Sequence, residues 1–118
     1  MTGNIYWLLE LDVRAGGLEP FRTLMGEMVA AAGGEPGTMN YEWNISGDGR
    51  VCHIYVRYRN SAAVMDHMAG WDMRFSKRFA ALSTITRMSV YGAPDAMVKA
   101  ALEPYGPVYY EPFGGFAP

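Results

Sequence analysis

The sequence predicts an α+β domain with a ferredoxin-like antiparallel sheet, whose elements follow the order β-α-β-β-α-β. Three observations lead to this prediction. Apolar and polar side chains alternate in four segments, which is typical of strands, and apolar residues recur at helical spacing in two longer segments. Turns rich in Gly and Pro separate these segments. A single short turn lies between the second and third strands, so those two form a hairpin.

The first strand is predicted at residues 5–13, where two faces alternate. The apolar face consists of Trp7, Leu9, Leu11 and Val13. The other face is mixed and consists of Tyr6, Leu8, Glu10 and Asp12. Gly16-Gly17 ends this strand, and Pro20 suits the first turn of a helix. That helix stops at Gly33-Gly34, and its apolar face consists of Leu18, Phe21, Leu24, Met25, Met28 and Ala32.

The second and third strands are predicted at residues 38–46 and 50–58, which alternate in the same way. The turn dipeptide Pro36-Gly37 leads into the first of them, and residues 47–49 (Gly-Asp-Gly) connect the two. The lone cysteine, Cys52, lies in the apolar pattern of the third strand. It has no second thiol with which to form an internal disulfide, so we expect a small core residue.

The second helix is predicted to begin at a cap supplied by Asn60 or Ser61 and to continue to about residue 82, with a bend at Gly70. Residues spaced by four positions place three side chains on one face of this helix: Ala63, His67 and Trp71. Residues 84–91 then alternate as a fourth strand. With this topology both helices cover the same face of the sheet.

Beyond the fourth strand we expect a short helix at residues 95–102 and a tail at residues 105–118, in which residues 107–112 suit an edge strand. The chain is therefore divided into a ferredoxin-fold domain, residues 1–94, and a C-terminal extension, residues 95–118. The tail is rich in large aromatic residues, among them Tyr109, Tyr110, Phe113 and Phe116. Such side chains are expected to pack on their own subunit or on a partner.

Composition excludes several classes of function. The 118 residues carry a net charge of −2 with no basic stripe, which argues against nucleic acid as a partner. No basic leader with an apolar segment and no apolar run of about 18 residues is present, so we expect a cytoplasmic protein without a membrane partner. Phosphate-binding loops, dinucleotide fingerprints and nucleophile elbows are missing, and no metal site is predicted, because the two histidines have no carboxylate at ligand spacing on a shared face.

The sheet face opposite the helices is expected to interleave aromatic, acidic and basic groups. Besides the mixed face of the first strand it carries His53, Tyr55, Arg57, Arg87, Ser89 and Tyr91. Such a face is either solvated or covered by a second copy. Aromatic residues beside carboxylate and Arg side chains favour a homodimer, since a two-fold interface lets each charge meet a complement.

Several motifs, in their order and spacing, carry a family likeness: Glu35-Pro36-Gly37, Tyr41-Glu42-Trp43, the segment 52–58, Ser61-Ala62-Ala63, His67 and Tyr91-Gly92. In these the chain resembles the antibiotic biosynthesis monooxygenase (ABM) domain of the dimeric α+β barrel superfamily. The resemblance covers residues 4–92, and residues 112–116 resemble an extension found in one branch of that family.

The resemblance implies a dimer packed sheet against sheet, with a cavity between the sheet and the helices of each subunit. It also implies oxygenation of quinols or polyketide aromatics by dioxygen, with no metal or flavin cofactor, although the family includes haem-degrading enzymes and proteins of unknown activity. Two positions depart from the family pattern. Val56 stands where related sequences often have a glutamate, and Tyr58 stands where the haem-degrading branch has a tryptophan, which argues against haem turnover.

The helix-facing side of the sheet is expected to enclose an apolar, aromatic space that suits a flat organic ring. Within it His67 is predicted to act as a base, and Tyr41 and Tyr58 are predicted to donate hydrogen bonds to a developing oxyanion. The predicted substrate-binding residues are Trp7, Trp43, Val56, Trp71, Phe75 and Met88. No second strong acid or base is expected beside His67.

Three interpretations stay open from the sequence. The first is a monooxygenase that acts on a phenolic, quinol or polyketide-like aromatic molecule. The second is a non-catalytic dimeric domain that binds such a molecule, in which His67 is a partly buried histidine satisfied by a neighbouring group and the tyrosines and tryptophans simply pack in the core. The third is lyase or isomerase chemistry.

Overall fold

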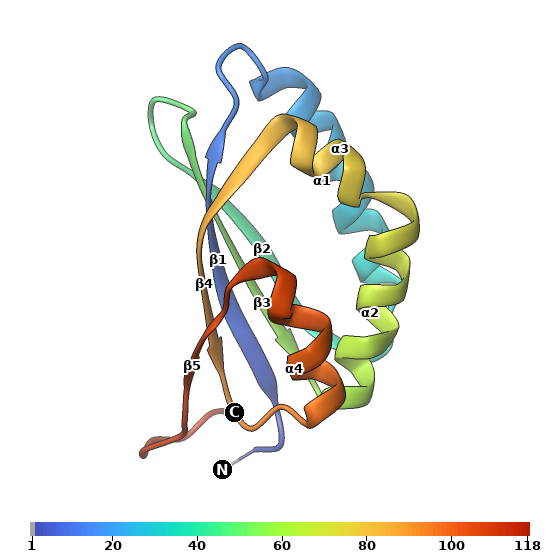
Figure 1. The fold of residues 1–118 in the computed structure, drawn as a ribbon, viewed down its shortest axis with the longest axis vertical. Helices are drawn as coiled ribbons and strands as arrows, with labels where there is room; N and C mark the ends of the chain where they lie inside the picture. The colour runs from blue at the N-terminus through green and yellow to red at the C-terminus, as the bar shows by residue number, and fades with distance from the viewer. Residues whose placement is uncertain (1) are drawn as a thin grey trace.

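The computed structural model describes residues 2–118 and confirms the predicted α+β fold, with one five-stranded sheet covered by helices on a single face (Figure 1). Its elements are β1 (Ile5–Val13), α1 (Leu18–Gly33), β2 (Thr38–Ile45), β3 (Val51–Tyr58), α2 (Ser61–Arg74), α3 (Ser76–Leu82), β4 (Ser83–Tyr91), α4 (Ala96–Leu102), the 3-10 helix η1 (Glu103–Tyr105) and β5 (Val108–Tyr110). The strand order is β2-β3-β1-β4-β5. Within residues 2–118, no helix is long and apolar enough to cross a membrane.

The sheet register places the predicted apolar side chains on the helix-covered face. β1 is the central strand and runs antiparallel to both β3 and β4, with Trp7 opposite Val56 on one side and Val90 on the other. Because side chains alternate along a strand, this pairing puts the three residues on the same face. All three are buried, as is Cys52, whose prediction as a core residue is confirmed.

The second helical segment breaks at Phe75 and not at Gly70, so the predicted bend was placed wrongly. α2 ends at Arg74, and Phe75 leaves helical geometry with φ −126° before α3 begins. Gly70 lies within α2 with open space around it, so nothing there forces a bend. The break at Phe75 instead allows its side chain and that of Phe79 to be buried against the core.

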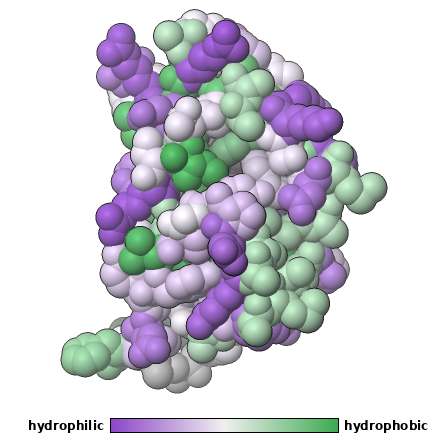
Figure 2. Space-filling view, in the orientation of Figure 1, coloured by the Kyte–Doolittle hydropathy of each residue, from purple (hydrophilic) through white to green (hydrophobic). Residues whose placement is uncertain are grey.

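The C-terminal segment folds back onto the same structure. Asp95 caps α4 by accepting a hydrogen bond from the backbone N–H of Val98 at 2.9 Å, and Val98 and Leu102 are fully buried in the core below α2. β5 then pairs with β4 in parallel, as the predicted edge strand. Beyond it the chain projects at the lower left of Figure 2, and Phe113 and Phe116 are fully exposed in the single chain. These two rings therefore do not pack on their own subunit, and packing on a partner stays a prediction.

The sheet face that the helices leave uncovered carries charged side chains beside aromatic rings. Glu10 lies between His53 and Arg87, with N···O distances of 3.6 and 3.9 Å. The Arg57 guanidinium lies 4.3 Å from the centre of the Tyr6 ring and donates to the Asn4 side chain at 2.8 Å. Glu10 and Arg87 therefore compensate one another within the subunit, whereas Arg57 contacts a neutral amide and an aromatic ring.

Candidate functional site

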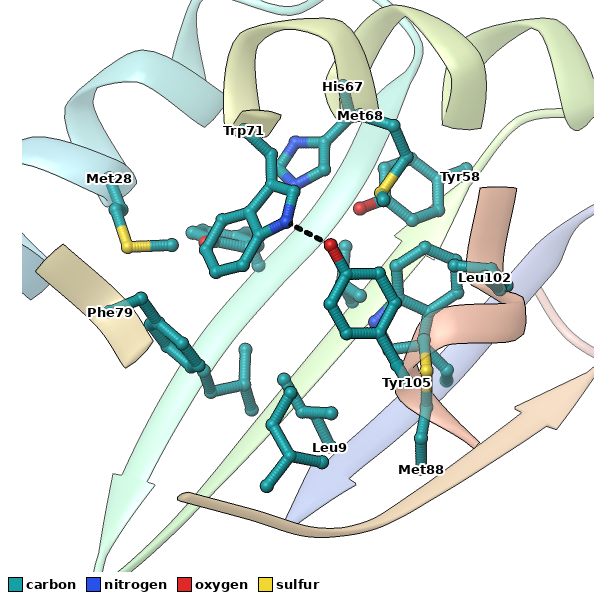
Figure 3. A pocket seen from close by; sticks show the side chains of 15 residues that line it. Leu9, Met28, Tyr58, His67, Met68, Trp71, Phe79, Met88, Leu102 and Tyr105 are labelled. Carbon is teal, nitrogen blue, oxygen red and sulfur yellow. Dashed lines mark hydrogen bonds between the residues drawn. The ribbon is translucent and has the colours of Figure 1, made fainter. Parts of the chain in front are cut away.

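A cavity of about 50 Å³ lies between the helix-covered face of the sheet and the helices (Figure 3). It is lined by Trp7, Leu9, Met28, Tyr41, Ile54, Val56, Tyr58, His67, Met68, Trp71, Phe79, Ile85, Met88, Leu102 and Tyr105. The cavity marks the seam between two clusters of buried side chains, and Leu9, Tyr41 and Trp71 contact both clusters. An apolar hollow with a few polar groups is the usual form of a small-molecule site.

The structure brings most of the sequence-predicted site residues to this cavity. The predicted catalytic residues that line it are Tyr41, Tyr58 and His67, and the predicted substrate-binding residues that line it are Trp7, Val56, Trp71 and Met88. Phe75 lies instead in an adjoining hollow. Trp43 lines neither one, because its ring packs between Phe21 and Phe79, at centroid distances of 5.5 and 6.3 Å.

The adjoining hollow, of about 210 Å³, lies between the end of α1 and α2. It shares four lining residues with the main cavity: Met28, Tyr41, His67 and Trp71. Charged groups from Glu35 and Arg74 also line it. The hollow therefore adjoins the main cavity through these shared side chains and lies on the helical side of the molecule.

His67 is held by a carboxylate that the sequence analysis did not expect. Its Nδ1 lies 2.8 Å from Oε1 of Glu35, and both side chains are largely buried, with exposed fractions of 13% and 24%. The Thr38 hydroxyl donates to the same oxygen at 2.8 Å. An ionised carboxylate can only accept, so neutral His67 carries its hydrogen on Nδ1 and keeps a free lone pair on Nε2.

The local sequence explains how this pair forms. α1 ends at Gly33, and Pro36 cannot continue the helix, so Glu35 falls in the turn before β2. A Cβ on Gly37 would overlap the methyl group of Ala63, so the glycine allows this turn to lie directly against the first turn of α2. His67 follows Ala63 by four positions, on the same helix face, and thus reaches Glu35.

Two tyrosine hydroxyls complete the polar part of the site. Burial raises the pKa of Tyr41 and of Tyr58 well above the usual value for tyrosine, so both remain protonated donors at neutral pH. The rings lie 5.8 and 5.4 Å from the His67 ring, between centroids. Tyr58 is fully buried, and its hydroxyl has no hydrogen-bond partner in residues 2–118. A buried hydroxyl without a partner costs stability, and this one lies at the cavity wall, where it is available to a ligand.

The arrangement suits the removal of a proton from a flat, apolar molecule. The free Nε2 of His67 can accept the proton, and Glu35 stabilises the resulting imidazolium, as the carboxylate does in catalytic triads. Neutral hydroxyls of Tyr41 and Tyr58 can donate to the anion that forms. We predicted that His67 would have no second strong acid or base beside it. That prediction is wrong, because the Glu35 carboxylate contacts the imidazole.

Glu35, Leu102 and Tyr105 are among the site residues that the sequence did not predict. Glu35 was interpreted only as part of a turn, and the turn pattern carries no signal for its contact with His67. Leu102 and Tyr105 line the cavity from the C-terminal segment, which the sequence analysis placed outside the main domain. No local pattern connects those two residues with His67.

Comparisons with known proteins support the fold. No family model and no curated protein matches the chain. Among solved structures, MupZ from Pseudomonas fluorescens is 18% identical with a TM-score of 0.88, and the match covers 100% of this chain and 91% of MupZ. The cofactor-independent oxygenase SnoaB from Streptomyces nogalater is 14% identical with a TM-score of 0.68, over 81% of this chain and 98% of SnoaB.

A third similar structure is a "putative antibiotic biosynthesis monooxygenase" from Nitrosomonas europaea, 16% identical with a TM-score of 0.69, over 79% of this chain and 92% of that protein. At these identities the likeness concerns the fold. The chain has the ferredoxin-like α+β fold of the ABM-domain proteins, and the predicted resemblance in fold is confirmed.

Proposed function

We propose that this protein is a cofactor-independent monooxygenase that oxidises a phenolic, quinol or polyketide-like aromatic molecule. The observation that carries the proposal is the Glu35–His67 pair at an apolar cavity that also contains the unpartnered Tyr58 hydroxyl. The neighbour SnoaB, described as a cofactor-independent oxygenase, supports it through the shared fold.

The first step is removal of a proton from the substrate by Nε2 of His67, from the hydroxyl group of a phenol or quinol or, in anthrone, from the methylene carbon opposite the carbonyl. The phenolate that forms is electron-rich enough to transfer one electron to dioxygen. Tyr41 and Tyr58 hold its oxygen by hydrogen bonds, and the apolar walls keep bulk water from the reduced oxygen species. Glu35 acts as a positioning residue in this step, since it touches the imidazole and not the substrate.

The second step joins the two radicals. The reduced oxygen bonds to a ring carbon that carries hydrogen, and the imidazolium returns its proton to give a hydroperoxide. Loss of the hydrogen on that carbon then breaks the O–O bond, so one oxygen atom stays as a carbonyl and the other leaves as water. For anthrone the balance is anthrone plus O2 giving anthraquinone plus water, and no external reductant is needed.

We further propose that the active form is a homodimer. The uncovered sheet face presents a row of stacked tyrosines, in which Tyr6 and Tyr91 lie 5.2 Å apart and Tyr91 and Tyr110 lie 5.5 Å apart, between centroids. Covering these aromatic rings with a second copy would stabilise the assembly, and Glu10 already lies beside Arg87 on the same face. A sheet with one face exposed to water also leaves a chain of this length with a small hydrophobic core, and a dimer would bury more apolar surface.

A second candidate function is binding without chemistry. The same fold without chemistry would serve as a dimeric interaction domain, and the size of the cavity favours that form of the alternative, because about 50 Å³ is smaller than the roughly 150 Å³ of an engineered cavity that takes up benzene. On this interpretation the Glu35–His67 pair only satisfies two buried polar groups.

Oxygen consumption separates the two functions. Dioxygen uptake is measured with 1-naphthol, a naphthoquinol and anthrone, for the intact protein, His67→Ala and Asp66→Ala. Asp66 is the matched control, since it precedes His67 on α2 but is exposed and lines neither the cavity nor the adjoining hollow. We expect His67→Ala to lower uptake by about 10²–10³-fold and Asp66→Ala to leave it unchanged. No uptake with any substrate, or equal uptake by His67→Ala, would contradict the proposal.

A further inference from the structure

We propose that Tyr105, supplied by the C-terminal segment, holds Trp71 as a movable wall of the cavity, and that this pair sets how many fused rings a ligand can have. The pair is called here the Trp71–Tyr105 gate. The inference rests on the proposed function only in taking an aromatic molecule as the ligand.

The need for a moving wall follows from volume. The cavity of about 50 Å³ is too small for an aromatic ring as it stands, since it has about a third of the volume of an engineered cavity of roughly 150 Å³ that takes up benzene. The walls contributed by the sheet are unsuited to movement, since Trp7, Val56 and Tyr58 are at most 5% exposed and belong to a densely packed cluster. The space must therefore come from a wall that borders solvent.

Trp71 is that wall. It lies on α2, is partly exposed, and lines the main cavity, the hollow of about 210 Å³ beside Glu35, and a third, open hollow of about 440 Å³ beside Phe79 and Ile85. Movement of one indole ring would join these spaces without disturbing the sheet.

Tyr105 fixes the indole in its present position. Trp71 Nε1–H donates to the Tyr105 hydroxyl at 2.9 Å, and the two side chains meet from opposite sides of the cavity (Figure 3). Tyr105 lines the main cavity and the open hollow, so it belongs to the same wall. Both partners border solvent, so water can replace the bond when the pair opens.

The backbone beside Tyr105 limits how the gate moves. Tyr105 is the last residue of η1, which ends at Gly106 with φ +65°, and it follows the fully buried Leu102 by three positions. α4 and β5 fix both sides of this turn. Opening is therefore expected to move the indole, with the phenol as a stationary latch.

The test uses Tyr105→Phe, which removes the hydroxyl and keeps the ring, and Trp71→Phe, which removes the indole. Tyr109→Phe is the matched control, because it changes a tyrosine of the same segment that lines neither the main cavity nor the two hollows beside Trp71. The protein is labelled with 5-fluorotryptophan, which gives one 19F signal for each of the three tryptophans. Binding of 1-naphthol and anthrone is measured under argon, so no oxidation can occur.

We expect Tyr105→Phe to shift the 19F signal of Trp71 and to enlarge the difference in its chemical shift between H2O and D2O, because the indole becomes more accessible to solvent. The Trp7 and Trp43 signals should stay unchanged. The association rate of 1-naphthol should rise at least threefold. Trp71→Phe should raise the affinity for anthrone about tenfold relative to that for 1-naphthol. Tyr109→Phe should change none of these quantities.

Unchanged association rates and an unchanged Trp71 signal in Tyr105→Phe would overturn the gate, as would failure of both aromatic compounds to bind to any form. Dioxygen uptake is followed separately on the intact protein. A gate effect without oxygen uptake would contradict the monooxygenase proposal and leave the gate in place, so the two failures are distinguishable.

Discussion

Gly37 lies directly against Ala63, so closely that a side chain on the glycine would overlap the alanine methyl group. This contact joins the turn after α1 to the first turn of α2, and the carbonyl of Gly37 also accepts a hydrogen bond from the Arg59 N–H at 2.9 Å. Glu35 precedes the glycine by two residues and His67 follows the alanine by one helical turn. The distance between the carboxylate and the imidazole therefore depends on the absence of a Cβ at position 37.

Gly37→Ala is expected to push α2 away from the turn and to lower the free energy of unfolding by about 1–3 kcal/mol, as overpacking does. The His67–Glu35 hydrogen bond should lengthen, which 15N NMR of the imidazole would detect. Gly26→Ala is the control, because Gly26 lies in α1 with open space around it. This variant should raise the free energy of unfolding by about 0.5–1 kcal/mol. Equal effects of the two substitutions would show that the close contact has no structural importance.

Glu35→Gln keeps the size of the side chain and removes its charge. The amide can still present its oxygen to Nδ1 but stabilises an imidazolium less, so we expect kcat to fall about 10–100-fold with KM nearly unchanged. NMR should show a mixture of His67 tautomers in place of a single one. Glu35→Asp should restore part of the rate. An increase in KM with kcat unchanged would instead assign Glu35 to substrate binding and not to positioning of His67.

Tyr58→Phe is expected to raise stability while lowering activity. The variant removes a buried hydroxyl that has no partner, so the free energy of unfolding should rise by about 1 kcal/mol. If that hydroxyl donates to the developing oxyanion, dioxygen uptake should fall about 10²-fold. Chemical denaturation and oxygen uptake on the same sample test both parts, and a stabilised variant with full activity would exclude Tyr58 from the reaction.

Alkaline pH should reveal the buried hydroxyls. Because the pKa values of Tyr41 and Tyr58 are raised in the folded chain, their contribution to stability is complete below about pH 10, the usual pKa of tyrosine. Above that pH the unfolded chain releases these protons while the folded chain keeps them, so stability falls. Absorbance at 295 nm should show two tyrosines that ionise only on unfolding, and only one in Tyr58→Phe.

Leu8→Arg tests the proposed homodimer. Leu8 is partly exposed on the uncovered face, opposite Tyr55 and Ser89 on the neighbouring strands. A guanidinium there would be buried without a partner in a sheet-to-sheet dimer, so we expect monomers in sedimentation experiments, with the far-UV CD spectrum retained. Val29→Arg, on the exposed side of α1, is the control. A protein that is monomeric without any substitution would contradict the dimer.

The sequence predicted the fold well because alternation and helical spacing report which side of an element is buried, and these patterns are local. His67, Tyr58 and Trp71 could be assigned to one cavity from their faces alone. Glu35 could not, since its role depends on how a turn and a helix 32 residues apart meet, and the turn pattern says nothing about that contact. The position of the helix break was also not predictable, because burial of Phe75 outweighs the flexibility of Gly70.

The burial of Cys52 has a consequence for the proposed oxygenase. Burial raises the pKa of this thiol to about 11, so almost none of it is thiolate at neutral pH, and the thiolate is the form that attacks peroxide. The exposed thioethers of Met73 and Met97 are far more accessible. Oxidative damage from escaped peroxide would thus fall on surface methionines, whose oxidation is reversible, and would spare the interior of the sheet.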